Sequence, residues 1–402
     1  MRQVVITGIS VLCSIGIGGE AFQEGLKKGV SGIGPITTFK TTDHHYKLGG
    51  EVKGFRPEEH FEKKDLRRMD RASQLTLVAA EQAVKEAGLN FSIEDPVRCG
   101  VMLGTTLGGM ISGEKYHRLA HHHRQRVSLL LDFPVHAAAD RLAIGYNLQG
   151  PAMIFSTACA SGAHSIGYGF DLISRGKADV ILAGGVDTMA EFTQCGFGAL
   201  QALIKTGESV SPFDKNRCGF ALGEGAAILI LEAKEHAGKR AAPIYCEIGG
   251  YGMSSDAYHM TAPDKEGNGA AMAMLRALRQ AGVQPESVDY INAHGTATRH
   301  NDLMETIAIK KVFGKFAYNL AVSSIKSMIG HTLGAAGSIE LAATALAMQG
   351  CFLPPTINYE TPDPQCDLDY VPNVARNKTI KTALSNSFGF GGTNISILLR
   401  RV

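Results

Sequence analysis

STACASG, residues 156–162, places a cysteine among small side chains immediately before a segment that predicts a helix. Cys159 therefore lies at or just before a helix N-terminus, where unpaired backbone N–H groups and the helix dipole favour a thiolate. Lowering a thiol pKa from about 8.5 to about 7 requires roughly 2 kcal/mol, and a helix N-terminus supplies about 0.3–2 kcal/mol. We expect the helix to activate the sulfur largely unaided. Taken alone, the cysteine is still better explained as a buried structural residue, so its partners must decide.

The bulk composition indicates a large, well-buried protein. A chain of 402 residues is too long for one small core and predicts two domains or one duplicated domain. The net charge of +2 gives no general basic field, so we expect no nucleic-acid partner. Apolar runs are too short for a membrane span, and we expect no membrane association. The eight cysteines are scattered without a Cys-x-x-Cys pair, which predicts reduced thiols in the cytoplasm and no zinc site.

Short apolar segments alternate with longer segments of helical periodicity, which predicts an α/β fold with strands covered on both faces. The predicted strands are 4–10, 99–106, 178–185, 226–232, 244–252, 289–295, 320–324 and 394–402. The predicted helices are 71–87, 135–145, 160–175, 269–282, 301–313 and 335–349. This order looks similar in two halves that meet near residue 240. The polar segment 112–126 predicts an exposed excursion, and its histidines 121–123 are interpreted as solvated surface.

Glycine-flanked loops downstream carry candidate partners for Cys159. NAHGTATRHND (292–302) ends a predicted strand and places His294 at the carboxyl edge of the sheet, where open α/β sheets bind ligands. SSIKSMIGHTLGAAG (323–337) places Lys326 and His331 in a second such loop, and SNSFGFGGTN (385–394) is a third. Single histidines are usually core residues, but this set is hard to explain by packing alone.

Together these motifs resemble the β-ketoacyl-acyl carrier protein synthases, most closely the elongating type II enzymes. The matching stretches, in family order over essentially the whole chain, are TACASG, LGEGAA, GMSSDAYHMT, NAHGTATRHND, SSIKSMIGHTLGAAG, PPTINYETPDPQCDLDYVP and SNSFGFGGTN. The resemblance implies a thiolase-like fold, with halves 1–240 and 241–402 forming a five-layered α-β-α-β-α core. It also implies a homodimer as the usual state, while a heterodimer with a different subunit stays open.

The resemblance assigns catalytic roles to matching residues. Cys159 corresponds to the acylated nucleophile, and His294 and His331 to the pair that stabilises the carbanion formed from malonyl thioester. Lys326 corresponds to the lysine that supports the second histidine, His331. The backbone N–H groups of Cys159 and Phe390 correspond to the oxyanion hole, and Phe390 to the gate of the acyl pocket. Neutral histidine donors suit the task because developing negative charge is what preorganised donors stabilise best.

Binding and structural positions follow from the same resemblance. The positions that correspond to pantetheine-binding threonines, acyl-pocket residues and the glycine gating loop are Thr296, Thr298, Leu107, Phe197, Gly389 and Gly391. Asp302 matches an acidic position and could equally cap the following helix. Glu340 is interpreted as structural, near a monovalent cation bound in some family members. We expect no resident cofactor, because the 4′-phosphopantetheine arm arrives on the acyl carrier protein.

A basic face is visible without the family. Lys64, Arg67, Arg68 and Arg71 recur at helical spacing, which predicts one positively charged helix face. Such a face is equally well explained as solvated surface. Because acyl carrier proteins are acidic and dock on this helix in the resembled enzymes, we favour docking.

Departures from the family pattern leave alternatives. Cys218 stands in FDKNRCGF where the family has aspartate, and the segment 112–133 is shorter than usual. A specialised lipid or polyketide ketosynthase therefore stays open, as do acyl length and saturation preference. A non-catalytic chain-length factor is disfavoured because Cys159, His294 and His331 are retained. A degradative thiolase would need a second reactive cysteine near the C-terminus, and no cysteine follows Cys366.

Overall fold

The computed structural model describes residues 1–124 and 126–402. The strands are β1 (Val4–Cys13), β2 (Gly16–Ile17), β3 (Gly34–Pro35), β4 (Leu48–Gly50), β5 (Cys99–Gly104), β6 (Ala152–Phe155), β7 (Val180–Asp187), β8 (Leu222–Gly223), β9 (Gly225–Ala233), β10 (Cys246–Ser255), β11 (Tyr290–Asn292), β12 (Ala321–Ser323), β13 (Phe352–Leu353), β14 (Arg376–Asn377), β15 (Thr382–Gly389) and β16 (Thr393–Arg400).

The helices separate these strands along the chain. They are α1 (Gly19–Lys28), α2 (Lys63–Leu66), α3 (Arg71–Glu86), α4 (Met110–His121), α5 (Ala137–Gly145), α6 (Ser161–Ser174), α7 (Glu191–Ala199), α8 (Lys234–Lys239), α9 (Asn268–Ala281), α10 (Arg299–Phe313), α11 (Lys326–Ile329) and α12 (Ala336–Gly350). Short 3-10 turns include η3 (Val127–Leu131), η5 (Gly314–Asn319) and η6 (Leu333–Ala335).

One pattern of strands occurs twice in the main sheet. In the first half the order is β1-β9-β7-β5-β6, and in the second it is β10-β16-β15-β11-β12. The pairing directions also match, because the first two pairs of each half are antiparallel and the last two are parallel. The antiparallel pair β1–β10 joins the two halves. The chain is thus built from two similar α/β halves.

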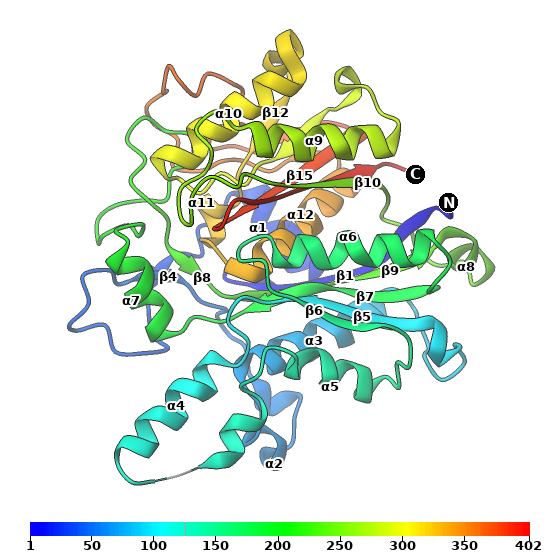
Figure 1. Cartoon of the computed structure of the whole chain (residues 1–402), viewed down its shortest axis with the longest axis vertical. Coiled ribbons are helices and arrows are strands. Elements are labelled where there is room, and N and C mark those ends of the chain that lie inside the picture. The colour runs from blue at the N-terminus through cyan, green and yellow to red at the C-terminus, as the bar shows by residue number, and fades with distance from the viewer. Residues whose placement is uncertain (125) are drawn as a thin grey trace.

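Helices and sheet halves alternate as five layers (Figure 1). Helices α3 and α5 cover the outer face of the first half, and α9 and α10 cover the outer face of the second. Helices α6 and α12 lie between the halves and contact each other as well as both sheets. Because β1, β5, β7 and β9 are covered on both faces, their residues are buried along the whole strand, whereas the edge strand β6 is partly exposed.

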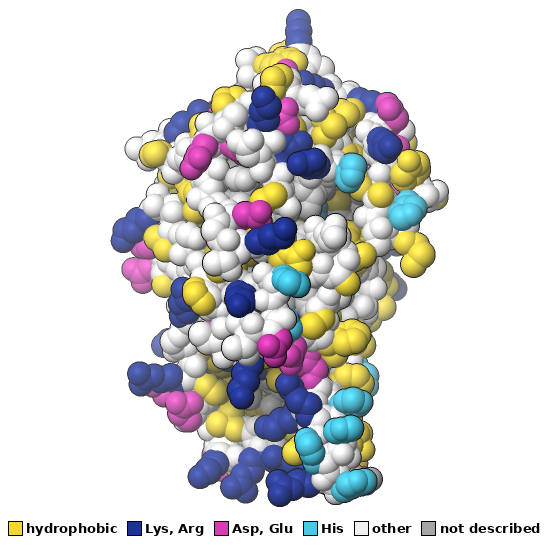
Figure 2. Space-filling model, turned by 90° about the vertical axis from the view of Figure 1, so that its left-hand side faces the viewer, with side chains coloured by type: hydrophobic (Ala, Val, Ile, Leu, Met, Phe, Trp, Pro, Cys, Tyr) yellow, Lys and Arg dark blue, Asp and Glu magenta, His cyan; other side chains and the backbone are white. Residues whose placement is uncertain are grey.

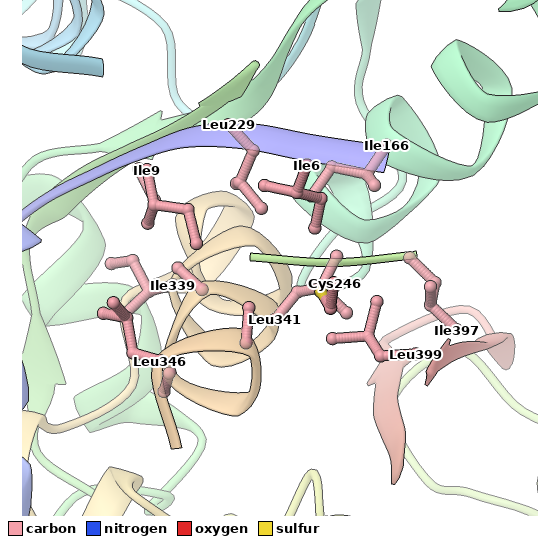
Figure 3. Close-up of a cluster of buried hydrophobic side chains, with 14 of the residues drawn as sticks. Ile6, Ile9, Ile166, Leu229, Cys246, Ile339, Leu341, Leu346, Ile397 and Leu399 are labelled. Atoms are coloured by element: carbon pink, nitrogen blue, oxygen red, sulfur yellow. The ribbon is translucent and has the colours of Figure 1, made fainter. Parts of the chain in front are cut away.

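The largest hydrophobic core fills the space between the halves (Figure 3). Ile6 and Leu229 point into it from the first sheet, Ile397 and Leu399 from the second, and Ile339 from the central helix α12. Each is at most 1% exposed, so the two halves share one buried interface. Removing such a side chain to alanine typically destabilises a protein by about 2–5 kcal/mol.

Most elements agree with the sequence expectations. Each of the predicted strands and helices overlaps an observed element of the same type, including the N-terminal strand β1. The sequence analysis missed the longer elements β15, α1 and α7 and several short ones, among them β6, α8 and α11, whose short or mixed patterns give no clear period. The predicted polar excursion holds the helix α4, and His121, His122 and His123 at its end are exposed. Within the described ranges, no helix combines the length and apolar character that a membrane crossing requires.

Candidate active site

Cys159 lies in a tight turn that leads into α6. Its neighbour Ala158 has a φ of +50°, a left-handed conformation that is unfavourable for a residue with a Cβ. The Ser161 hydroxyl accepts a hydrogen bond from the Thr157 N–H at 2.9 Å and donates one to the Ala158 carbonyl at 2.5 Å. The side chains are small because a Cβ on Gly162 would come within 2.8 Å of the Gly334 carbonyl. The turn is therefore held by packing and by its own hydrogen bonds.

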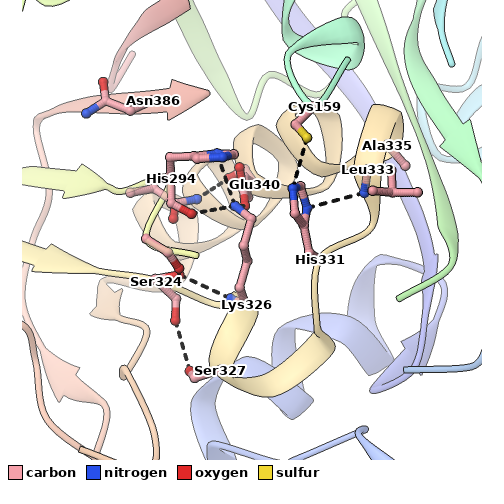
Figure 4. Close-up of polar contacts among 12 residues, drawn as sticks. Cys159, His294, Ser324, Lys326, Ser327, His331, Leu333, Ala335, Glu340 and Asn386 are labelled. Atoms are coloured by element: carbon pink, nitrogen blue, oxygen red, sulfur yellow. Dashed lines mark hydrogen bonds and ion pairs between the residues drawn. The ribbon is translucent and has the colours of Figure 1, made fainter. Parts of the chain in front are cut away.

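His331 faces the sulfur of Cys159 from the loop after α11 (Figure 4). Its Nε2 lies 3.0 Å from the cysteine Sγ. On the other side of the ring, the Leu333 N–H donates to Nδ1 at 3.3 Å. Because Nδ1 accepts this bond, the neutral ring carries its proton on Nε2, which then donates toward the sulfur.

His294 follows β11 and lies beside His331, with ring centroids 5.5 Å apart. The Lys326 ammonium lies 3.3 Å from His294 Nδ1 and donates to the His294 carbonyl at 2.6 Å. The same ammonium forms a fully buried ion pair with Glu340 (Figure 4). The prediction that Lys326 supports the second histidine was wrong, since its hydrogen bonds go to His294. The reason is that the Lys326 side chain rises from the start of α11 between the two histidines, and its ammonium ends at the Nδ1 and the carbonyl oxygen of His294.

Burial determines the protonation states of the three groups. It holds the pKa of both His294 and His331 well below the usual histidine range, and the nearby Lys326 charge acts in the same direction. Both imidazoles are therefore neutral at pH 7. Burial also raises the pKa of the Cys159 thiol to about 12, against the lowering effects of Lys326 and the Phe390 N–H. The expectation that the helix activates the sulfur largely unaided was wrong, because burial raises the thiol pKa instead.

Glu305 is a buried carboxylate that sequence reasoning missed. From α10 it accepts hydrogen bonds from the N–H groups of His294 at 2.9 Å and Gly295 at 2.8 Å. Asn386 of β15 donates to it as well, at 3.2 Å. Burial raises the pKa of Glu305 to about 7. It fixes the backbone of the His294 loop, and its only sequence signal is an acidic residue on an otherwise buried helix face.

A pocket of about 690 Å³ connects Cys159, His294 and His331 with the surface. Cys159, His294 and His331 line its inner end, while Phe197, Thr296, Thr298, Phe390 and the glycines Gly389 and Gly391 line the channel. The hydroxyls of Thr296 and Thr298 are hydrogen-bonded to each other at 2.9 Å. The Phe390 ring lies 5.8 Å from that of Phe197 and is 39% exposed, and its role as a gate stays a prediction.

Three further candidates lie around this pocket. Leu107 does not line it but packs behind it, in a small apolar cluster with Phe197, Phe220 and Leu333. Cys218 is exposed and lines the pocket near its mouth. Asp302 is buried in the first turn of α10 and accepts a hydrogen bond from the Phe213 N–H at 2.8 Å, whereas Thr298 occupies the N-cap.

Four buried oxygen atoms behind the site have no hydrogen-bond partner in the described part of the chain. They belong to Glu340 (Oε2), Asn292 (Oδ1), Ser385 (Oγ) and Ser387 (Oγ). Asn292 pairs with Ser385 across β11 and β15, and its amide donates to the Glu340 carbonyl at 2.8 Å. Unpaired buried oxygens of this kind fit a water molecule or a cation. Elsewhere in residues 1–124 and 126–402, no three His, Cys, Asp or Glu side chains gather as a metal site.

The predicted basic face is divided between two helices. Lys64 ends up in the short α2, Arg67 and Arg68 in the exposed segment after it, and Arg71 at the start of α3. Figure 2 shows lysine, arginine and histidine gathered at the end of the molecule that holds α2 and α4. Asp70 breaks the helical spacing, because its carboxylate caps α3 by accepting from the Ala72 N–H at 2.9 Å.

Arg71 does not belong to the exposed face. Its guanidinium forms two hydrogen bonds, of 2.6 and 2.9 Å, with the fully buried carboxylate of Glu224. The prediction of one continuous face that includes Arg71 was therefore wrong. The exposed cations that remain are Lys64, Arg67 and Arg68.

Two family models cover most of the chain. The model of the β-ketoacyl synthase N-terminal domain matches residues 1–237, and that of the β-ketoacyl synthase C-terminal domain matches residues 245–360. The chain belongs to the β-ketoacyl synthase family. The predicted family is thereby confirmed, while the predicted division at residue 240 stays a prediction.

Full-length relatives support this assignment. The chain is 44% identical to a 3-oxoacyl-[acyl-carrier-protein] synthase 2 of Coxiella burnetii, over 100% of this chain and 99% of the relative. It is 42% identical to the protein of the same name from Synechocystis sp., over 100% and 98%.

Solved structures of other ketosynthases are similar over their whole length. One, described as the ishigamide ketosynthase/chain length factor, has a TM-score of 0.95 and 37% identity, and covers 100% of this chain and 99% of that one. Another, a type II polyketide ketosynthase in complex with its acyl-carrier protein, has a TM-score of 0.92 and 34% identity over 100% and 99%. This likeness confirms the predicted thiolase-like fold.

Proposed function

We propose that the protein is a 3-oxoacyl-acyl carrier protein synthase, which condenses an acyl chain with malonyl-acyl carrier protein in fatty acid elongation. The observation that carries the proposal is the meeting of Cys159 with two neutral histidines at the inner end of one pocket. The names of the full-length relatives support the same reaction.

In the first step, the Cys159 sulfur attacks the thioester carbonyl of an acyl group on the carrier. The Cys159–acyl bond forms and the bond from the acyl carbon to the carrier sulfur breaks. The thiol proton ends on the departing carrier thiol. The Phe390 N–H already points at the cysteine sulfur, and it becomes a donor for the tetrahedral oxyanion together with the Cys159 N–H. Covalent storage divides a demanding condensation into two easier steps.

In the second step, malonyl carrier protein enters and its thioester oxygen lies between the two imidazoles. The Nδ1 atoms of His294 and His331 accept from Lys326 and Leu333, so each Nε2–H is free to donate to this oxygen. The bond to the carboxylate breaks, carbon dioxide leaves, and the two donors stabilise the enolate. The enolate carbon then attacks the acyl carbon, and the Cys159 sulfur leaves and takes a proton from solvent.

The deciding experiment measures products rather than substrate loss. Purified protein is incubated with malonyl carrier protein and a ladder of acyl carrier proteins, and the products are identified by mass spectrometry. We expect 3-oxoacyl carrier proteins two carbons longer than the acyl donor. Malonyl decarboxylation without any condensation product would contradict the proposal. The ladder also gives the preferred acyl length.

The partners belong to the same proposal. The exposed Lys64, Arg67 and Arg68 carry charge opposite to an acidic acyl carrier protein, which brings the phosphopantetheine arm and leaves no need for a resident cofactor. The edge strand β6 and the exposed side chains Met153, Leu131 and Phe133 suit a dimer interface. All eight cysteines are free thiols, as a protein of the reducing cytoplasm would carry.

The proposal includes a monovalent cation held by the four buried oxygen atoms behind the site that have no hydrogen-bond partner in the described part of the chain. Glu340, Asn292, Ser385 and Ser387 would hold it through oxygen atoms alone. When bound, it would supply positive charge beside the Glu340 carboxylate. The catalytic steps above use only the residues of the chain itself.

A second candidate is a polyketide ketosynthase that works with a different subunit. It is favoured by the likeness to structures described as a ketosynthase with a chain length factor. The two candidates differ in their assembly, since the first predicts activity from this chain alone. Activity that appears only after a second subunit is added would favour the polyketide enzyme.

A further inference from the structure

We propose that Asp187 is a positioning residue that fixes the Cys159 turn and the His331 loop against each other. The inference rests on the proposed function, because it concerns the groups that carry the proposed reaction. Asp187 is the last residue of β7, is 0% exposed, and lies outside the set of residues that line the pocket.

Both oxygens of Asp187 are occupied by donors from two different loops. Oδ1 accepts from the Thr105 hydroxyl at 2.7 Å and the Leu107 N–H at 2.9 Å. Oδ2 accepts from the Thr106 N–H at 2.9 Å and the Gly334 N–H at 2.6 Å. Thr105 to Leu107 follow β5 in the first half, whereas Gly334 belongs to the second half. One carboxylate therefore ties together the two halves of the molecule.

In the second half of the molecule, the hydrogen bond from Gly334 to Asp187 restrains the loop that carries the His331 imidazole. Gly334 directly follows Leu333, whose N–H donates to His331 Nδ1 and so keeps the proton on Nε2. A side chain at position 334 is excluded, because its Cβ would lie 2.7 Å from Asp187 Oδ2 and 2.6 Å from the Thr106 nitrogen. Holding Gly334 thus holds the donor that selects the His331 tautomer.

In the first half of the molecule, the hydrogen bond from Thr106 to Asp187 restrains the turn that carries Cys159. The Thr106 hydroxyl donates to the Ala158 carbonyl at 3.2 Å, one residue before Cys159. Ala158 is the residue held in a left-handed conformation, and the Thr106 hydroxyl adds a restraint from the loop after β5 to those that the Ser161 hydroxyl and N–H place on the same carbonyl. The 3.0 Å separation of sulfur and Nε2 is then set by hydrogen bonds that meet at Asp187.

The charge of Asp187 disfavours the Cys159 thiolate, which distinguishes a residue that positions the site from one that activates the thiol. The negative charge of Asp187 raises the pKa of Cys159, so removal of the charge makes the thiolate easier to form. A residue present to activate the thiol would have the opposite effect. Loss of Asp187 should therefore separate two properties of the site: thiol reactivity rises while histidine-dependent chemistry falls.

The test compares Asp187→Asn with the unaltered protein in two assays on the folded fraction. In Asp187→Asn, an NH₂ group faces donors that need an acceptor. We expect kcat for malonyl decarboxylation to fall at least about tenfold with KM unchanged, since a misplaced catalytic group affects the transition state. We also expect the midpoint of the pH dependence of Cys159 alkylation by iodoacetamide, measured by peptide mass spectrometry, to move to lower pH.

Two variants control for charge and for burial. Asp187→Glu keeps the carboxylate, and its alkylation midpoint should stay that of the unaltered protein. Glu232→Gln changes another fully buried carboxylate. Glu232 lies near the end of β9, whereas Gly225, which pairs with Asp187, lies at its start. Glu232→Gln should leave both the decarboxylation rate of the folded fraction and the alkylation midpoint unchanged.

Several outcomes would overturn the inference. If Asp187→Asn lowers only the yield of folded protein, with the decarboxylation rate of the folded fraction unchanged, Asp187 is merely structural. If that variant does not fold, Gly334→Ala keeps both the Asp187 charge and the backbone N–H, but its Cβ forces the loop away from Asp187. It should lower decarboxylation at least about tenfold, and an unchanged rate would refute the inference. The alkylation assay needs no substrate, so it still tests Asp187 if the unaltered protein fails to decarboxylate malonyl carrier protein and the proposed function falls.

Discussion

At the scale of single residues, the site depends on two neutral imidazoles and one buried ammonium. Lys326 and Leu333 donate to the inner ring nitrogens, which turns both Nε2–H groups toward the pocket. The thiol itself is not activated by its surroundings, since burial raises its pKa to about 12. The two Nε2–H donors of His294 and His331, rather than the Cys159 thiol, are therefore the preorganised part of the site.

Removal of the nucleophile should separate the two half-reactions. Cys159→Ala is expected to abolish acyl transfer and condensation while malonyl carrier protein is still decarboxylated, because the two histidines remain. Radiolabelled carbon dioxide release and product mass spectrometry measure the two reactions. Condensation by the purified variant would refute the assignment of Cys159.

Removal of one partner of the buried Lys326–Glu340 ion pair should destabilise the protein. Lys326→Met leaves the Glu340 carboxylate buried without its ammonium, and we expect a loss of about 3–5 kcal/mol in the free energy of unfolding. Urea unfolding measures this loss. The double variant Lys326→Met/Glu340→Leu should regain part of it, and equal stabilities of the single and double variants would argue against the pair.

The lowered histidine pKa values give a pH prediction. Burial disfavours the imidazolium of His294 and His331, so both rings stay neutral as the pH falls through the usual histidine pKa of about 6.5. The single-turnover rate of malonyl decarboxylation should therefore be flat from about pH 8 down to about pH 6. Glu305, with its pKa of about 7, also titrates in this range, so a fall near the usual histidine pKa that persists in Glu305→Gln would show that at least one ring is solvated.

At the scale of elements, the boundary between α2 and α3 decides which cations can meet a carrier protein. Asp70 caps α3, and the ion pair with Glu224 turns Arg71 inward. Arg67 and Arg68 precede the cap and remain exposed. The helix break thus separates the proposed docking surface from the buried contact between Arg71 and Glu224.

Charge reversal on this segment tests the docking surface. Arg67→Glu/Arg68→Glu should raise KM for acyl carrier protein several-fold, with a smaller effect at high salt, because charge steering is screened. Alkylation of Cys159 by a small thiol reagent should not change. Arg279→Glu/Lys315→Glu, two exposed cations on α9 and η5, serves as the matched control. Equal KM values for the two double variants would remove this segment from the proposal.

At the scale of the whole molecule, two similar halves bring their equivalent loops to one junction. Cys159 and Asp187 come from the first half, whereas His294, Lys326 and His331 come from the second. The central helices α6 and α12 pack between the sheets and carry the Cys159 turn and the His331 loop into contact. The site therefore exists only when both halves are folded against each other.

The free edge of the sheet gives a prediction about assembly. Met153 is 41% exposed on β6, the last strand of the first half. Met153→Asp places a charge on this edge and should shift the proposed dimer toward monomer in sedimentation experiments, because edge pairing buries apolar side chains. Met272→Asp on α9, at a residue 45% exposed, is the control. An unchanged dimer would place the interface elsewhere.

The sequence by itself determined the α/β class, the order of most elements, the family, and the residues Cys159, His294, Lys326 and His331, because these lie in local patterns of period, glycine and spacing. Tertiary structure alone decided which histidine Lys326 contacts, that burial raises the thiol pKa, and that Arg71 points inward to Glu224. It also brought Glu305 and Asp187 to the catalytic loops. These features depend on burial and on contacts between residues distant in the chain, and such contacts leave no periodic trace in the sequence.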